Sequence, residues 1–223
     1  MCGRYVFISN VDAIKRLFRF ENLPNLAPRY NIAPTQQIPI VRSNGDAREM
    51  VNVRWGLLPF WLKEAPKGPP VINAKAEGIE AKPMFRAAIA KRRCLVPADG
   101  FYEWKGPKGD KRPYLIQMQD KQPFAFAGVW ERWKSPEGDI DSAAILTCEP
   151  NSLMAEIHDR MPVILDPTEF DAWLSDKTPS ADVGKMIDPF PAEQMRAVPV
   201  SKAVNSVKNA GPECIEPLEA GAV

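Results

Sequence analysis

The second residue of the chain is a cysteine that could carry chemistry closed to an internal thiol. A small side chain at position 2 usually permits removal of Met1, so we expect a mature chain that begins at Cys2. Its α-amine, with an ordinary pKa of about 7.7–8, then lies next to a thiol with a pKa of about 8.5. Such a 1,2-aminothiol condenses with an aldehyde: the amine forms a Schiff base, and the thiol closes a thiazolidine ring. The competing interpretation is a chance cysteine at a frayed terminus.

His158 is the one histidine of the chain, and it lies in the stretch His158-Asp159-Arg160-Met161-Pro162. We expect this stretch to join a helix to a strand, which is a frequent place for a functional side chain. An imidazole is the group best suited to proton transfer near neutral pH. A lone histidine is more often a hydrogen-bonded core or surface residue, so the sequence leaves both roles open.

Glu103 is flanked by aromatic residues in the stretch Gly100-Phe101-Tyr102-Glu103-Trp104. If this stretch is a strand, side-chain alternation places Phe101 and Glu103 on one face and Tyr102 and Trp104 on the other. An aromatic neighbour desolvates the carboxylate, which favours its protonated form and makes it a usable general acid. The alternative is a carboxylate that points to solvent.

Other side chains could hold a polar ligand. Asn73 offers both a donor and an acceptor for a sugar or carbonyl oxygen, although turn formation is its alternative role. Trp61 lies in an aromatic and proline-rich loop and is a candidate for stacking on bases. The segment 82–93 contains several basic residues and no acidic one, namely Lys82, Arg86, Lys91, Arg92 and Arg93. Such a run could bind a row of DNA phosphates, but it is equally typical of a solvated surface.

The bulk composition is that of an ordinary soluble globular protein. The 223 residues are 45% hydrophobic and 26% charged, and the net charge of +1 means that a polyanion would have to bind at a local patch. No apolar run approaches the roughly 20 residues of a membrane span, and charged residues interrupt any signal peptide near the N-terminus. We therefore expect a cytoplasmic protein. The four cysteines are widely spaced, which predicts neither a zinc site nor a disulfide framework.

The order of short apolar segments predicts one α+β domain over residues 1–223, with an antiparallel, barrel-like sheet and a few short flanking helices. The 23 prolines fall between segments, which favours a loop-rich β fold, and residues 23–39 read as loop. Residues 210–223 are rich in Gly and Pro and are expected to form a loose tail. Helices are predicted at 9–22, 83–92, 152–157 and 168–174, and strands at 5–8, 38–42, 50–55, 94–96, 100–104, 113–117, 124–133, 143–148, 162–165 and 195–200.

Several of these stretches, taken together and in order, resemble the SRAP family, the SOS-response-associated peptidase-like proteins. Any one of them would be a weak signal, but the ordered set covers nearly the whole chain. The stretches are Met1-Cys2-Gly3-Arg4-Tyr5, Arg29-Tyr30-Asn31-Ile32-Ala33-Pro34, Trp55-Gly56-Leu57-Leu58-Pro59, Ile72-Asn73-Ala74-Lys75-Ala76-Glu77, Gly100-Phe101-Tyr102-Glu103-Trp104, His158-Asp159-Arg160-Met161-Pro162 and Val200-Ser201-Lys202-Ala203-Val204-Asn205.

The resemblance implies a sensor and shield of abasic sites in single-stranded DNA, which is associated with the nucleoid when bound. It implies that Cys2 forms a thiazolidine crosslink with the aldehyde of the ring-opened sugar, with a secondary strand-cleaving lyase activity through the Schiff base. Glu103 would move protons and assist reversal, and His158 would help to stabilise the opened sugar. Asn73 would hold the sugar or the Cys2 terminus. No cofactor or metal is implied, and we expect a monomer.

The resemblance also implies a set of DNA contacts. Phosphates beside the lesion would be bound by Arg4, Lys75 and Arg160, with Arg86 nearby. Flanking bases would stack on or be wedged by Trp61 with Pro39. The family commonly has Arg where this chain has Lys75, and Lys keeps the charge but loses the bidentate fork.

Two other functions remain open at this point. The first is an N-terminal-nucleophile peptidase, in which the Cys2 thiolate attacks an amide and its own amine acts as the base. The second is a non-covalent single-strand-binding module that uses Trp61 and the basic run without chemistry.

Overall fold

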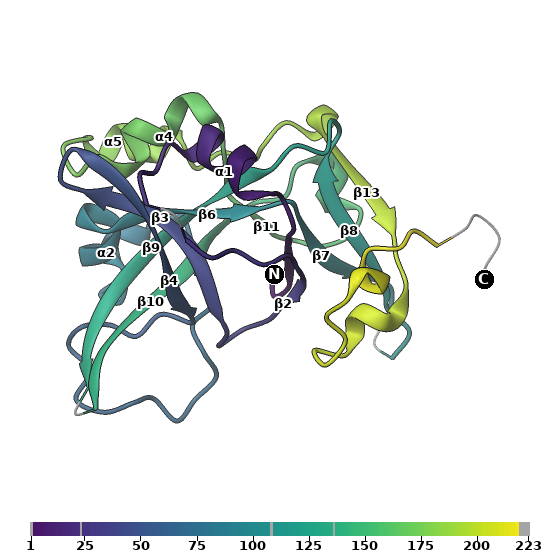
Figure 1. Ribbon diagram of the computed structural model, residues 1–223, viewed down its shortest axis with the longest axis horizontal. Helices are drawn as coiled ribbons and strands as arrows, with labels where there is room; N and C mark the ends of the chain where they lie inside the picture. Colours follow the sequence, from purple (N-terminus) through teal and green to yellow (C-terminus); the bar gives the residue numbers. More distant parts are fainter. Residues whose placement is uncertain (1, 23, 108, 136, 219–223) are drawn as a thin grey trace.

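The computed structural model describes residues 2–22, 24–107, 109–135 and 137–218. Two β-sheets occupy the centre, and short helices lie around them (Figure 1). The strands are β1 (Tyr5–Phe7), β2 (Arg29–Ile32), β3 (Gln37–Asn44), β4 (Ala47–Trp55), β5 (Asn73–Lys75), β6 (Arg93–Ala98), β7 (Gly100–Lys105), β8 (Arg112–Met118), β9 (Phe124–Ser135), β10 (Gly138–Cys148), β11 (Met161–Pro162), β12 (Ile164–Leu165) and β13 (Met195–Pro199).

The helices are short, and α1, α4 and α5 lie together along one side of the molecule (Figure 1). The α-helices are α1 (Val11–Phe18), α2 (Arg86–Lys91), α3 (Ser152–Ala155), α4 (Phe170–Leu174) and α5 (Ser180–Lys185). Single 3-10 turns are η1 (Ile79–Ala81), η2 (Pro167–Glu169), η3 (Ala192–Gln194), η4 (Lys202–Asn205) and η5 (Pro212–Cys214). No helix in the described part of the chain has the length and apolar character that a membrane-spanning segment needs.

The larger sheet closes on itself as a barrel. Going round it, β10 pairs with β4, β4 with β3, β3 with β6, β6 with β9, and β9 again with β10. The predicted α+β fold with a barrel-like sheet is confirmed, with one difference: β10 and β4 run parallel, as do β10 and β5. Strands β6 and β9 approach so closely that a Cβ at Gly128 would lie 2.8 Å from the Cys94 sulfur. Closure leaves the barrel without exposed edges.

The smaller sheet fixes the segment that follows Cys2. Its strand order is β13-β8-β7-β1-β2, so β1 is hydrogen-bonded on both sides. Tyr5 lies opposite Phe101 of β7 and opposite Ile32 of β2. The predicted alternation along β7 is confirmed, because Phe101 joins the main core whereas Tyr102 joins a smaller cluster on the other face.

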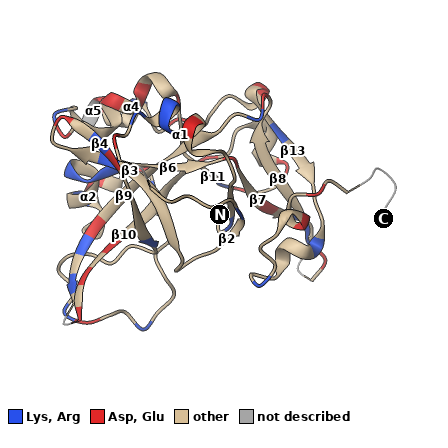
Figure 2. Ribbon diagram, viewed as in Figure 1, with Lys and Arg blue, Asp and Glu red and all other residues tan. Residues whose placement is uncertain are grey.

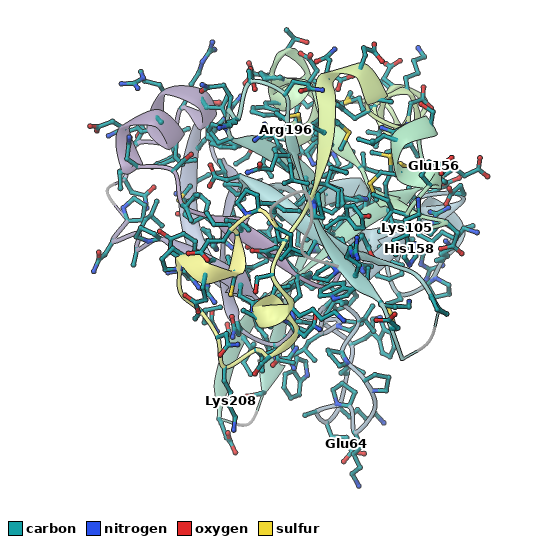
Figure 3. The ribbon with its side chains drawn as sticks, turned by 90° about the vertical axis from the view of Figure 1, so that its right-hand side faces the viewer. Glu64, Lys105, Glu156, His158, Arg196 and Lys208 are labelled. Carbon is teal, nitrogen blue, oxygen red and sulfur yellow. The ribbon has the colours of Figure 1, made fainter. Side chains whose placement is uncertain are left out.

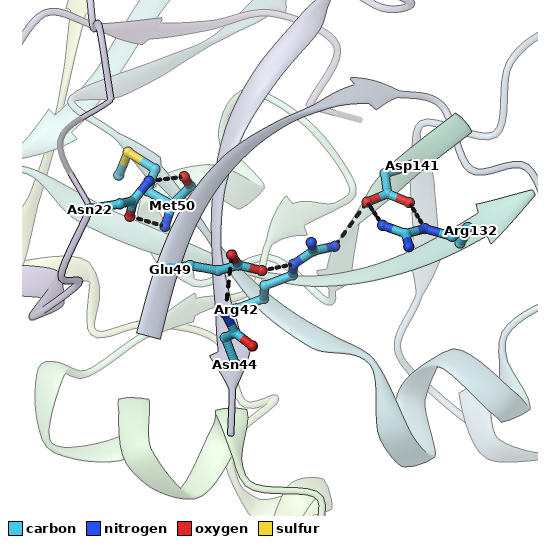
Figure 4. A network of polar contacts seen from close by, with 7 residues as sticks. All are labelled: Asn22, Arg42, Asn44, Glu49, Met50, Arg132 and Asp141. Atoms are coloured by element: carbon cyan, nitrogen blue, oxygen red, sulfur yellow. Dashed lines mark hydrogen bonds and ion pairs between the residues drawn. The ribbon is translucent and has the colours of Figure 1, made fainter. Parts of the chain in front are cut away.

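The first helix is shorter than the predicted 9–22. Asn10 is its N-cap and accepts a hydrogen bond from the Ala13 N–H, whereas Ser9, the first residue of the predicted helix, bonds to Asp99. The helix ends at Arg19, whose left-handed backbone (φ 54°) cannot continue it. Asn22, which the prediction placed in the helix, instead exchanges two hydrogen bonds with the backbone of Met50 (Figure 4).

The prediction of a loose tail is wrong for residues 210–218. Cys214 is fully buried, and its carbonyl accepts a hydrogen bond from the Tyr102 hydroxyl. Pro217 forms an isolated bridge with Val200. Burial of Cys214 among the Gly and Pro residues fixes this segment against the rest of the fold. The remainder of the predicted tail, 219–223, lies outside the described residues.

Charged pairs cover the outside of the barrel rather than its interior. Both signs alternate along the outer half of the β9–β10 hairpin (Figure 2). The Arg42 guanidinium bonds to Glu49 at 2.7 Å and to Asp141 at 2.9 Å, and it lies 4.2 Å from the centroid of the Trp130 ring (Figure 4). Hydrogen bonds, first from Arg132 and then from Arg42, lower the pKa of Asp141 despite its partial burial. This network links β3, β4, β9 and β10.

Asp99 anchors the connection between β1 and α1, and its loss is expected to destabilise the fold. Its buried carboxylate accepts hydrogen bonds from the N–H of Ile8 (2.6 Å) and of Ser9 (2.9 Å) and from the Ser9 hydroxyl. Asp99→Ala leaves these donors without an acceptor, so we expect about 3 kcal/mol less free energy of unfolding in urea titration. Asp99→Asn keeps one acceptor oxygen and should lose less. A change below about 1 kcal/mol in the alanine variant would contradict this role.

Candidate active site

Cys2 is held in the interior by Asn73. The Asn73 Nδ2 donates a 2.9 Å hydrogen bond to the Cys2 carbonyl, and the cysteine is fully buried. Asn73 begins β5, which pairs in parallel with β10, so this residue belongs to a strand and not to a turn. Among the described residues, the buried Oδ1 of Asn73 accepts no hydrogen bond. The structure thus brings together Cys2 and Asn73, both of which are candidate site residues predicted from the sequence.

Burial raises the pKa of the Cys2 thiol far above its ordinary value, and the nearby Glu103 carboxylate raises it further. The thiol sulfur faces the Arg4 carbonyl at 4.0 Å. In this environment the sulfur is a protonated thiol at neutral pH.

Glu103 lies inside the molecule and not toward solvent. It sits in the middle of β7, opposite Tyr114 of β8, and is only 3% exposed. Its Oε2 lies 4.0 Å from Nε2 of His158. The same carboxylate is near enough to Cys2 to raise the pKa of its thiol, so Glu103 neighbours both the cysteine and the imidazole.

His158 follows α3, and its backbone N–H donates to the Met154 carbonyl at 2.8 Å. Figure 3 labels the residue on the side of the molecule where Lys105 and Glu156 form an ion pair of 3.6 Å. Its Nδ1 lies 3.0 Å from the Arg160 N–H and 2.8 Å from Oδ1 of Asp159. The ring therefore presents Nε2 to the buried carboxylate and Nδ1 to the loop.

Two of the arginines predicted to bind phosphate are engaged with the protein itself. Arg4 donates from Nη1 to the Asn31 side chain and to the Val204 carbonyl, both at 2.8 Å. Arg160 forms a two-pronged ion pair with Glu77, at 2.7 and 2.8 Å, and a further bond to the Thr147 carbonyl at 2.6 Å. Sequence reasoning missed Glu77 as a partner of Arg160, because 83 positions separate the two residues and no local pattern links them.

The remaining predicted contacts differ in how available they are. Lys75 is exposed at the end of β5. Trp61 is 51% exposed and Phe60 54%, and both lie in the loop 56–72 that projects from one end of the barrel (Figure 1). Arg86 begins α2 and lines a cavity of about 400 Å³ together with residues of η1 and α5, apart from the cluster around Cys2.

Pro39 cannot act as a wedge between bases in this structure. It lies within β3, opposite Asn52 of β4, and its side chain is buried. The turn between β2 and β3 carries another proline, Pro34, which is partly exposed. The wedge role came from the family resemblance, whereas the sequence itself places Pro39 in the predicted strand 38–42, and a strand tolerates proline where its missing N–H is not needed.

A family model described as SOS response associated peptidase (SRAP) matches residues 1–207. The chain belongs to the SRAP family.

Individual relatives in the SRAP family align with most of this chain. Abasic site processing protein YoqW of Bacillus subtilis (strain 168) is 42% identical over 97% of this chain and 99% of its own length. Abasic site processing protein YedK of Escherichia coli (strain K12) is 31% identical over 98% of this chain and 100% of its own length. Abasic site processing protein HMCES of Gallus gallus is 33% identical over 87% of this chain and 67% of its own length. A crystal structure of a protein from Bacteroides thetaiotaomicron has a TM-score of 0.85 at 28% identity, covering 97% of this chain and 100% of that one.

Within the described ranges, no three side chains of the His, Cys, Asp and Glu types gather closely enough to hold a metal ion.

Proposed function

We propose that the protein recognises abasic sites in single-stranded DNA and captures them covalently through Cys2 once Met1 has been removed. The observation that carries the proposal is the position of Cys2, whose carbonyl is held by Asn73 while Glu103 and His158 lie next to it. The names of the relatives, abasic site processing proteins, support the same substrate. We further propose a monomer that works in the cytoplasm, at the nucleoid, without cofactor or metal.

The chemistry begins at the amine. The α-amine of Cys2 adds to the C1 aldehyde of the ring-opened sugar, and the resulting carbinolamine loses water to give a Schiff base. The thiol then adds its sulfur to the same carbon while its proton passes to nitrogen, which closes the thiazolidine. Each step moves one proton, and no electron acceptor or donor is needed. Because the thiol stays protonated, we place amine attack before sulfur attack.

Glu103 and His158 would move these protons. A carboxyl next to the carbon that loses water can protonate the departing hydroxyl and later take a proton back. His158, at 4.0 Å from Glu103, would hold the opened sugar hydroxyls and share the proton. Asn73 keeps the Cys2 backbone still, and its buried Oδ1 would accept a hydrogen bond from the new α-ammonium or from the sugar. The same Schiff base would permit strand cleavage by β-elimination as a minor reaction.

DNA contacts follow from the exposed groups. Lys75 would bind a phosphate beside the lesion, and Trp61 would stack on a flanking base. Arg4 and Arg160 would bind phosphates only through those guanidinium N–H groups that do not already bond to Asn31 and Glu77. Arg86 would bind the DNA backbone further from the lesion. Pro34 replaces Pro39 as the proline available to a base.

A cysteine peptidase needs the Cys2 thiolate as its first nucleophile, whereas in the proposed capture the amine attacks first, which suits a thiol whose pKa is raised by burial. A non-covalent binding module would leave the buried group of Cys2, Glu103 and His158 unexplained, since stacking and phosphate contacts need no buried acid.

Intact mass spectrometry tests the proposal. The protein is mixed with a single-stranded oligonucleotide that carries one abasic site, and the matched control carries the site reduced to the alcohol, which has no aldehyde. We expect a protein mass that lacks Met1 and an adduct with the aldehyde form that survives heating without borohydride. Absence of this adduct on a chain confirmed to begin at Cys2 would overturn the proposal, and equal binding of intact strands would favour the non-covalent module.

A further inference from the structure

We propose that Glu77 is a positioning residue that sets which nitrogen of His158 carries the proton. The inference rests on the proposed role of His158 in the capture of the abasic site, although its central test needs no DNA. Glu77 does not touch the ring. It acts through Arg160, whose side chain it holds and whose backbone N–H contacts the imidazole.

The Arg160 side chain is fixed at three points. Its two Nη atoms bond to both carboxylate oxygens of Glu77, and Nη2 also bonds to the Thr147 carbonyl of β10. The Arg160 side chain is only 14% exposed and that of Glu77 is 43% exposed, so the arginine is shielded from solvent while the carboxylate is partly open to it, and the two-pronged geometry is what holds the pair. Its hydrogen bond with Arg160 lowers the pKa of Glu77, so the carboxylate is charged at neutral pH.

The fixed arginine places its backbone next to the ring. The Arg160 N–H lies 3.0 Å from Nδ1 of His158 and can donate only if Nδ1 carries a lone pair. Oδ1 of Asp159 lies 2.8 Å from the same nitrogen and can accept only if Nδ1 carries a proton. The two contacts therefore require opposite states of Nδ1.

The contest at Nδ1 decides what faces Glu103. With the lone pair on Nδ1, the neutral ring carries its proton on Nε2, which lies 4.0 Å from the buried Glu103 carboxylate. With the proton on Nδ1, Nε2 presents a lone pair to that carboxylate and repels it. Asp159 is 88% exposed, so water can replace its hydrogen bond to the ring at little cost in free energy. The Arg160 side chain, in contrast, is held by Glu77. The anchored arginine therefore favours the proton on Nε2.

The charged groups that the described residues place beside the ring can be varied singly. Glu103 approaches from β7, Asp159 and Arg160 come from the loop of His158 itself, and Glu77 follows β5. The Lys105–Glu156 ion pair lies on the same side of the molecule (Figure 3). Because His158 is the one histidine in the sequence, its ring nitrogens give unambiguous signals.

The test is ¹⁵N NMR of the imidazole in the full chain without DNA, at an alkaline pH where the ring is neutral. In the unaltered protein we expect Nε2 to show the signal of a protonated nitrogen and Nδ1 that of a lone pair. In Glu77→Ala the arginine keeps only its bond to the Thr147 carbonyl and fixes the loop less firmly, so the proton should move to Nδ1 and the two signals should exchange character. Glu77→Gln keeps a hydrogen-bond acceptor for Arg160 and should behave like the unaltered protein.

A double variant separates this mechanism from a general loosening of the loop. If Asp159 is the group that captures the proton when Arg160 is released, then Glu77→Ala combined with Asp159→Ala should restore the proton to Nε2. Asp159→Ala by itself should leave the tautomer unchanged. The backbone amide spectrum reports whether each variant is folded. If Glu77→Ala is not, Glu77→Met, which also lacks the carboxylate acceptor but keeps the length of the side chain, takes its place. A proton on Nδ1 in the unaltered protein, or an unchanged ring in folded Glu77→Ala, would overturn the inference.

Crosslinking kinetics supply a second readout. At saturating abasic oligonucleotide, Glu77→Ala should crosslink about tenfold more slowly, because part of the acid–base contribution is lost, whereas Glu77→Gln should remain within about twofold. A slower rate that saturating DNA restores fully would assign Glu77 to DNA binding and contradict a role in positioning. If the unaltered protein forms no crosslink, the proposed function fails, and the NMR result still decides the tautomer.

Discussion

Replacing Cys2 with alanine or serine is expected to reduce the heat-stable adduct with abasic single strands to an undetectable level. Cys2→Ser keeps the α-amine and so still forms a Schiff base, which borohydride should trap, but its hydroxyl does not close the thiazolidine. Cys2→Ala removes the group that closes the ring altogether. In both variants the salt-sensitive binding of single strands should persist, because phosphate contacts do not depend on the thiol. Denaturing gels with and without borohydride measure both products.

Cys214 provides the matched control for this experiment. It is also a fully buried free cysteine, but it belongs to the C-terminal segment and packs with Val204 and Tyr102. Cys214→Ala should crosslink at the rate of the unaltered protein. A heat-stable adduct formed by Cys2→Ala at the normal rate would rule out the aminothiol mechanism.

The second large effect is expected at Glu103. Glu103→Gln keeps the size of the side chain and removes its capacity to exchange a proton, so crosslink formation and reversal should both slow by about 100-fold. Formation is measured as adduct against time, and reversal as transfer of the protein from a preformed crosslink to a competing aldehyde. Both directions share the same proton transfers, so they should slow together.

Glu131 separates this catalytic effect from the loss of any buried carboxylate. It is 2% exposed, similar to Glu103, and bonds to Arg92 at 2.7 Å on another part of the barrel. Glu131→Gln should leave both rates unchanged within about twofold, even where it lowers the free energy of unfolding. Unaltered rates in Glu103→Gln would remove Glu103 from the mechanism.

Much of the barrel was predictable because its strands are long and apolar. Strands β6, β9 and β10 contain the predicted segments and are each longer than predicted by two to five residues. The alternation predicted along β7 correctly placed Glu103 on the same face as Phe101. Short polar strands were missed. The strand β5, Asn73–Lys75, has three residues and no apolar run, and β2 lies in a proline-rich stretch that reads as loop.

The arrangement of the site depends on contacts that no local pattern encodes. Strand β5 is held by β10, which comes about seventy residues later in the chain (Asn73 opposite Ile145), and Glu77 meets Arg160 across 83 positions. Burial of Pro39 likewise depends on pairing between β3 and β4. Sequence reasoning could name Cys2, Glu103 and His158 as candidates, whereas their approach to one another depends on pairings between distant strands, such as β1 with β7 in the smaller sheet.

The pairing of β1 with β7 also places a time limit on the maturation of the N-terminus. Tyr5 finds its partner Phe101 only after that residue has been synthesised, so a growing chain cannot bury Cys2 before then. At about 5–20 residues per second, the ribosome leaves the terminus open to an aminopeptidase for roughly 5–20 s. Once the sheet has formed, the Cys2 side chain is buried. We therefore expect Met1 to be removed during translation, before β1 and β7 have paired, so that slower elongation gives a larger fraction of chains that begin at Cys2.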